Sequence, residues 1–192
     1  MHITNWKKEI FTIPNMLSAF RIVLIPVYVW LYQAADTIED YHAAALVLAA
    51  SCLTDMVDGK IARKYNMISQ VGKVLDPLAD KLTQLAMLIC LTSRYRRLRL
   101  MLVLFLIKEF WQLFAMLGAM RHGKALNGAL MSGKISTTFL FTGLGLMFLF
   151  PDMSEQTANI IVNICTAALL YAFGDYVLAY FGKNKKIYDL EG

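Results

Sequence analysis

The chain has 192 residues, of which 58% are hydrophobic and 17% are charged. An ordinary soluble domain has an apolar share of about 45–50%, so this composition excludes a typical soluble protein and predicts a protein of the bilayer. The formal net charge of +5 favours membrane lipids and phosphate-bearing substrates as partners, and nucleic acid is not an expected partner.

Six apolar segments follow one another along the chain, and a bilayer crossing takes about 20 residues. We expect them at about residues 16–32, 41–55, 72–90, 100–120, 130–150 and 157–181. The first opens after Thr12-Ile13-Pro14-Asn15, and polar residues from Lys60 onward break the second. The expected fold is an all-α integral membrane protein with six transmembrane helices in one bundle and a short amphipathic N-terminal segment. We expect one domain over residues 1–192 and no secretory signal peptide.

Basic residues are enriched in cytoplasmic loops of membrane proteins. With six spans, four basic segments share one side with both termini: residues 7–8, 63–64, 121–124 and 183–186. The acidic loops 36–40 and 152–155 lie on the other side, together with the basic loop 94–99, which departs from the rule. We therefore expect both termini in the cytoplasm and a bacterial cytoplasmic membrane, with a mitochondrial membrane as the alternative.

Four aspartates lie in and between the second and third segments, where charge is costly. With the residues between them they follow the pattern D-x2-D-G-x2-A-R-x8-G-x3-D-x3-D. The positions are Asp55, Asp58, Gly59, Ala62, Arg63, Gly72, Asp76 and Asp80. On helices, members of each aspartate pair are three or four residues apart and project from one face. Two such faces packed side by side would bring four carboxylates together near the membrane surface.

Converging carboxylates in a low-dielectric environment repel one another and lose hydration. Hard divalent cations relieve this repulsion, and Mg²⁺ and Mn²⁺ prefer oxygen ligands. Two such ions about 4 Å apart would hold a pyrophosphate during phosphoryl transfer. Gly59 would let a phosphate approach closely, and the guanidinium of Arg63 suits a phosphate. Alternatives are a solvated helix end around Asp55, Asp58 and Gly59, or an ion-conducting pathway of intramembrane acids.

At all eight positions the pattern resembles the signature of the CDP-alcohol phosphatidyltransferases. Ile13-Pro14-Asn15 with Arg21, and the run 72–81, are similar to the phosphatidylglycerophosphate synthase and cardiolipin synthase branches. The resemblance implies an often dimeric enzyme that transfers the phosphatidyl group of CDP-diacylglycerol to a small or lipid alcohol and releases CMP, using two Mg²⁺ or Mn²⁺ ions.

The resemblance also implies roles for individual residues. It makes Asp55, Asp58 and Asp76 metal ligands, and Asp80 a residue at the metals and the general base. The residues expected to contact the cytidine diphosphate are Asp55, Gly59, Ala62, Arg63 and Gly72. No organic cofactor is expected.

Charged residues elsewhere are candidates for binding the acceptor alcohol. They are Arg21, Lys108, Arg121 and Lys134. Lys134 lies in a Gly-Lys segment similar to one in phosphatidylglycerophosphate synthases, where a cation would hold the phosphate of glycerol 3-phosphate. Lys108 beside Glu109 is equally consistent with a structural ion pair.

Acceptor identity is open from the sequence. Phosphatidylglycerophosphate synthases commonly have Ala-Arg-Glu where this chain has Ile107-Lys108-Glu109. We expect glycerol 3-phosphate as the acceptor, with phosphatidylglycerol, the acceptor of cardiolipin synthases, as the alternative. A cation channel or transporter is the alternative of a different class, and a structural protein with a vestigial site is the third.

Overall fold

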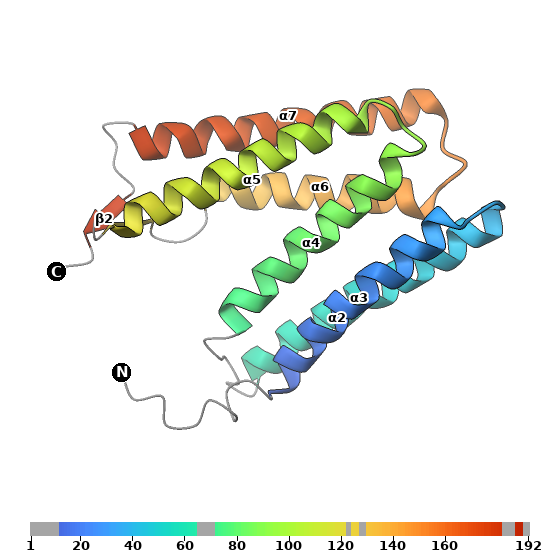
Figure 1. The fold of residues 1–192 in the computed structure, drawn as a ribbon, viewed down its shortest axis with the longest axis horizontal. Helices are drawn as coiled ribbons and strands as arrows, with labels where there is room; N and C mark the ends of the chain where they lie inside the picture. Colours follow the sequence, from blue (N-terminus) through green and yellow to red (C-terminus); the bar gives the residue numbers. More distant parts are fainter. Residues whose placement is uncertain (1–11, 65–71, 122–123, 127–129, 182–186, 190–192) are drawn as a thin grey trace. The chain divides into compact units, whose positions relative to one another are not determined.

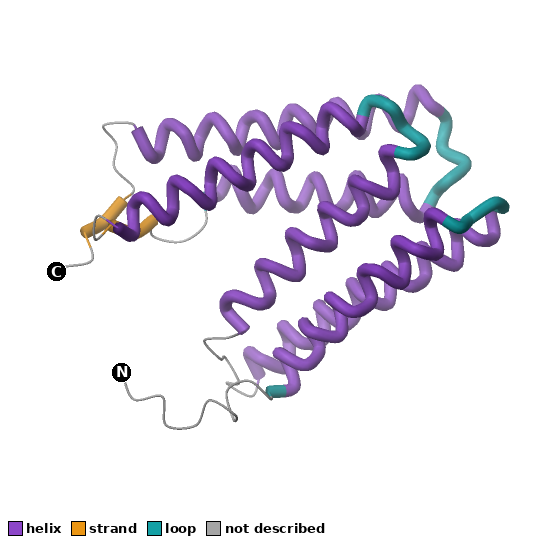
Figure 2. The backbone as a smooth tube through the Cα atoms, in the orientation of Figure 1, coloured by secondary structure: helices purple, strands orange, loops and turns teal. Residues whose placement is uncertain are grey.

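The computed structural model describes residues 12–64, 72–121, 124–126, 130–181 and 187–189, and for 55–64 it describes only the helical backbone. These residues form six helices and two short strands (Figure 1). In chain order they are α2 Ile13–Gln33, α3 Ile38–Lys64, α4 Gly72–Thr92, α5 Leu98–Arg121, β1 Lys124–Leu126, α6 Met131–Leu149, α7 Glu155–Phe181 and β2 Ile187–Asp189. The all-α class is confirmed, and Figure 2 shows how little of the described chain is strand. The expected N-terminal amphipathic segment lies outside the described residues.

Three segments are long and apolar enough to cross a membrane in the described part of the chain: Asn15–Gln33 of α2, Leu98–Gly118 of α5 and Glu155–Phe181 of α7. Only 17–28% of each is buried within the protein. Large apolar side chains on these helices, such as Trp30, Phe114 and Leu178, are accordingly exposed. Such contiguous exposed apolar surface is what lipid covers in an integral membrane protein. Membrane crossing by α3, α4 and α6 stays a prediction.

The second apolar segment, expected over about 41–55, lies within α3, which continues to Lys64. Lysine, arginine and alanine have high helix propensity, so residues 60–64 extend the helix beyond the apolar stretch. Asp55, Asp58, Gly59, Ala62 and Arg63 therefore all lie on the C-terminal part of one continuous helix.

The helix starts follow local signals in the sequence. Pro14 is in the first turn of α2, where its missing N–H costs no hydrogen bond. Before α3, the Thr37 hydroxyl and amide both donate to the Asp40 carboxylate, at 2.7 and 2.9 Å, and the Asp40 amide donates back to the hydroxyl. This reciprocal pair is a capping box with aspartate in the third position. Before α7, the Ser154 hydroxyl accepts the Thr157 amide at 3.2 Å.

The chain divides into two compact units, each described by itself. The first comprises residues 1–90 and Phe148–Asp152. In it α2 packs along α3. Tyr28 is fully buried, meets the Phe148 ring edge-on at 6.0 Å and donates weakly to the Thr83 carbonyl of α4. An apolar hollow of about 500 Å³ is lined by α2 and α4 side chains.

The second unit comprises residues 91–147 and 153–192. Here α5 packs on α7, and the Trp111 ring of α5 lies 5.6 Å from Phe173 and 5.9 Å from Tyr180 of α7. Strands β1 and β2 pair antiparallel, with Lys124 opposite Asp189. No sequence pattern predicts these strands, because three residues are too few for an alternating pattern.

Candidate active site

The aspartates of α4 contact a buried polar stripe on α2. Ser18 Oγ donates to Asp76 Oδ1 at 2.6 Å, and Arg21 Nη1 donates to Asp80 Oδ1 at 2.5 Å. The two donors are at positions i and i+3 on α2, and the two acceptors are at positions i and i+4 on α4. Each pair therefore lies on one face of its helix. The two helices therefore meet in a register that gives each carboxylate one specific partner.

Burial differs sharply across the Arg21–Asp80 pair. The Arg21 side chain is 2% exposed and that of Asp80 is 39% exposed. A buried guanidinium without a counter-charge would be strongly unfavourable, so the ion pair holds Arg21 inside the helix packing and fixes the Asp80 carboxylate. The carboxylate itself stays accessible, as a group that must meet a substrate requires.

The described part of the motif fits the expected metal chemistry in its donor set. Asp76 and Asp80 each use one oxygen for a protein hydrogen bond, and carboxylate oxygens are the ligands that Mg²⁺ and Mn²⁺ prefer. Among the described residues no group of three or more His, Cys, Asp or Glu side chains gathers to hold a metal. The side chains of Asp55 and Asp58 lie outside the described residues, so a four-carboxylate site stays a prediction.

The other nucleotide-site residues are placed only by their backbone. Asp55, Asp58, Gly59, Ala62 and Arg63 have the predicted helical spacing on α3, and their side chains are outside the description. Gly72 is the first residue of α4 and is buried. Gly72 lies one turn before Asp76. Because glycine has no Cβ, another group can come close to the backbone of α4 at this position.

The residues predicted to bind the acceptor alcohol lie on several helices. Arg21 lies at Asp80, as described above. Lys108 of α5 is buried and donates to Glu109 Oε1 at 2.6 Å. The ion pair considered from the sequence was one with another span, whereas this pair joins adjacent residues of one helix. Lys134 of α6 is exposed, and the Arg121 side chain lies outside the described residues.

Polar and aromatic side chains also meet within the second unit, and Lys108 contacts one of them. Its ammonium lies 5.8 Å from the centre of the Tyr176 ring, and the Tyr176 hydroxyl accepts the Leu130 amide at 3.3 Å. Ser132 donates to Asp175 at 2.5 Å. Gln112 Oε1 and Ser136 Oγ are buried with no hydrogen-bond partner in the described part of the chain. Such oxygens are costly to leave unsatisfied and could serve a hydroxylated ligand.

Sequence reasoning missed Ser18. Its signal is the spacing Asn15, Ser18, Arg21, three polar residues at successive three-residue intervals in an otherwise apolar helix, and all three are buried. Polar residues at that spacing predict a polar stripe facing a polar partner.

The described residues define an all-helical membrane protein in which two motif carboxylates are held at a helix contact and one of them, Asp80, stays accessible. The family model described as CDP-alcohol phosphatidyltransferase matches residues 11–173, which include the whole aspartate motif. The chain therefore belongs to the CDP-alcohol phosphatidyltransferase family, and members of this family generally use divalent metal ions.

Individual relatives differ in their named activity. A Streptomyces coelicolor cardiolipin synthase (CMP-forming) is 38% identical over 146 residues, covering 74% of this chain and 65% of the relative. A Schizosaccharomyces pombe cardiolipin synthase (CMP-forming)/mitochondrial hydrolase fusion protein is 44% identical over 89 residues, which are 46% of this chain and 14% of the relative. The Escherichia coli K12 CDP-diacylglycerol–glycerol-3-phosphate 3-phosphatidyltransferase is 29% identical over 178 residues, with 88% and 94% covered. The chain thus spans less than two thirds of the first two relatives.

Proposed function

We propose that the protein transfers the phosphatidyl group of CDP-diacylglycerol to glycerol 3-phosphate, forming phosphatidylglycerophosphate and CMP. The observation that carries this is the pairing of Asp76 with Ser18 and of Asp80 with Arg21, which holds two motif carboxylates in fixed, separate orientations. The nearly end-to-end match with the glycerol-3-phosphate 3-phosphatidyltransferase of Escherichia coli supports this acceptor.

The donor chemistry follows from the motif. Asp55, Asp58, Asp76 and Asp80 would hold two Mg²⁺ or Mn²⁺ ions, which, when bound, neutralise the diphosphate of the donor. Gly59, Ala62, Arg63 and Gly72 would lie against the cytidine diphosphate. Ser18 donates to one oxygen of Asp76, and the other oxygen is the one proposed to bind a metal ion.

Asp80 serves as the general base. It accepts the proton of the acceptor hydroxyl while that oxygen forms a bond to the phosphatidyl phosphorus, and the bond from this phosphorus to the CMP oxygen breaks. Arg21 orients the carboxylate through its 2.5 Å hydrogen bond and is a positioning residue. CMP leaves with the bonding electrons.

We propose that cationic side chains predicted from the sequence bind the acceptor. A phosphomonoester needs several convergent donors, and Lys108, Lys134 and Arg121 are the side chains proposed to supply them. Arg21, which was also a candidate from the sequence, is buried against Asp80 and keeps the positioning role. Phosphatidylglycerol is the second candidate acceptor, favoured by the higher identity to the cardiolipin synthase of Streptomyces coelicolor.

We place the active site on the cytoplasmic side of a bacterial cytoplasmic membrane, in a homodimer. The excess of basic residues in segments that share a side with both termini supports the orientation. The bacterial origin of the Streptomyces and Escherichia relatives supports the membrane.

An acceptor panel tests the function. Purified protein with labelled CDP-diacylglycerol and Mg²⁺ or Mn²⁺ is given glycerol 3-phosphate, phosphatidylglycerol, inositol phosphate or serine, and CMP is measured. We expect CMP only when the donor and glycerol 3-phosphate are both present. Release with phosphatidylglycerol instead identifies the cardiolipin reaction. Cation flux in liposomes without CMP release under any condition would overturn the transferase assignment in favour of a channel.

A further inference from the structure

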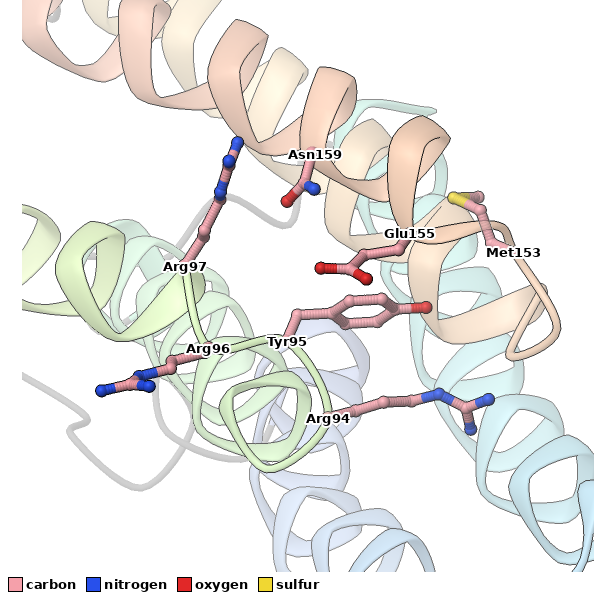
Figure 3. Close-up of a pocket in the computed structure, with 7 residues that line it drawn as sticks. All are labelled: Arg94, Tyr95, Arg96, Arg97, Met153, Glu155 and Asn159. Carbon is pink, nitrogen blue, oxygen red and sulfur yellow. The ribbon is translucent and has the colours of Figure 1, made fainter.

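A pocket of about 360 Å³ opens at the turn between α4 and α5, in the second unit (Figure 3). Its lining residues are Arg94, Tyr95, Arg96, Arg97, Met153, Glu155 and Asn159. None of them belongs to the aspartate motif. Arg94 follows the C-terminal end of α4, whereas Asp76 and Asp80 lie in its N-terminal half. Asp80 and Thr92 are separated by about 18 Å along the helix axis at 1.5 Å per residue.

Backbone hydrogen bonds fix both walls of this pocket. The amides of Arg94 and Tyr95 both donate to the Leu91 carbonyl, at 3.1 and 2.9 Å, and the Leu98 amide donates to the Tyr95 carbonyl at 3.0 Å. On the other wall, the Ser154 hydroxyl caps the start of α7. The arginine-bearing turn therefore has a defined backbone conformation.

The pocket lies where two candidate membrane spans begin. Leu98, directly after the turn, opens the span of α5, and Glu155 in the pocket wall opens the span of α7. The ends of spans are at the depth of the lipid headgroups. A phosphate at this place would therefore come from the bilayer surface.

The lining has the chemistry of a phosphate site. The lining includes three arginines and one glutamate, so it carries an excess of two positive charges, and guanidinium groups bind phosphate oxygens in a bidentate manner. The Tyr95 hydroxyl is buried and has no hydrogen-bond partner in the described residues. In Figure 3 the Tyr95 ring lies between the Glu155 carboxylate and the Arg94 side chain, where a bound headgroup would satisfy its hydroxyl.

We propose that this pocket binds the phosphate group of an anionic phospholipid headgroup at the membrane surface, separately from the catalytic site. The arginines take the phosphate oxygens and the Tyr95 hydroxyl donates to one of them. The Glu155 carboxylate and the Asn159 amide accept hydrogen bonds from hydroxyls of the headgroup. Free inorganic phosphate has the same anionic chemistry, and the experiment separates these two sources.

The test uses the full-length protein, delipidated in neutral detergent. Native mass spectrometry counts bound phosphatidylglycerol against phosphatidylcholine for the wild type, for Arg94→Gln combined with Arg97→Gln, and for Tyr95→Phe. Arg99→Gln is the matched control, because Arg99 is exposed in the same region and does not line the pocket. Inorganic phosphate is added as the competing probe.

We expect the double arginine variant to lose one bound phosphatidylglycerol and to bind this lipid roughly tenfold or more weakly, since charge-assisted hydrogen bonds are lost. Tyr95→Phe should weaken it roughly threefold, and it keeps the proposal testable if the double variant is poorly produced. Arg99→Gln should match the wild type, and the KM for CDP-diacylglycerol should be unchanged in all variants. Equal binding by the double variant or by Tyr95→Phe, equal binding of phosphatidylcholine, or full displacement by millimolar inorganic phosphate would each overturn the proposal.

Discussion

Each of the two units contains a serine hydroxyl that donates a short hydrogen bond to an aspartate on another helix, but the surroundings of the two aspartates differ. In the first unit Ser18 holds Asp76 at 2.6 Å and a buried arginine holds the neighbouring, accessible Asp80. In the second unit Ser132 holds Asp175 at 2.5 Å, next to close glycine contacts between α6 and α7. A carboxylate held by hydrogen bonds is thus not diagnostic of catalysis. What distinguishes the first unit is a second, exposed carboxylate one turn away.

The largest expected effect comes from removing a motif carboxylate. Asp76→Asn and Asp80→Asn should each lower CMP release by roughly 10²–10⁴-fold, because a metal contact or the general base is lost. CMP release by the purified variants measures this, with circular dichroism confirming the helical content.

Asp175→Asn is the matched control, since it alters a similar serine-bound carboxylate outside the motif. We expect it to retain CMP release within about tenfold of the wild type. An Asp76→Asn variant as active as Asp175→Asn would remove the functional contrast between the two units.

Arg21 offers a second test of the difference between the two units, because we propose that it affects the reaction only by orienting Asp80. Arg21→Gln should lower kcat by roughly 10–100-fold while the KM for CDP-diacylglycerol changes little, as expected for a misoriented base. Arg21→Lys should restore part of kcat, since one charged donor is retained. A purely structural Arg21 would instead lower the amount of folded protein and leave kcat per folded molecule intact.

Helix contacts in the second unit predict a stability effect. A Cβ at Gly143 would lie 2.5 Å from Cys165 Sγ and 2.9 Å from Ile161 Cγ2, so Gly143→Ala should destabilise the protein by about 1–3 kcal/mol through overpacking. Adding Cys165→Ala should recover part of this loss. Gly145→Ala is the control, because nothing lies within 4 Å of its added Cβ. Thermal unfolding in detergent measures all three; a neutral Gly143→Ala would contradict the close contact.

The smallest effect concerns the capping box at the start of α3. Hydrogen bonds from the Thr37 hydroxyl and amide lower the pKa of the Asp40 carboxyl from its ordinary value of 3.8. A lowered folded pKa means that the stabilisation is present above that ordinary value and is lost as pH falls through the folded pKa. Thr37→Val should therefore raise the Asp40 pKa and reduce the acid-side dependence of the unfolding midpoint. NMR titration of Asp40 reports the shift, and an unchanged pKa would mean that the hydroxyl does not bind the carboxylate in solution.

Features set by neighbouring residues could be predicted from the sequence, whereas contacts between residues far apart in the chain could not. The start of α2 near Pro14 was predictable because a proline in the first helical turn is a local signal. The helical spacing of Asp55 and Asp58 was predictable for the same reason, since α3 continues through both to Lys64. Ser18 was missed because its function depends on α4, 58 residues further along the chain.

The sequence alone determined the class of protein and the identity of the motif, since composition sets membrane preference and the eight motif positions have spacings that chance rarely produces. Only the tertiary structure decided which α2 side chain meets which aspartate, that Lys108 pairs with its neighbour, and that the arginines of the α4–α5 turn share a pocket with the start of α7. The contacts between α2 and α4 and the pocket at the α4–α5 turn depend on how segments distant in sequence pack, and no local propensity encodes a register between two helices.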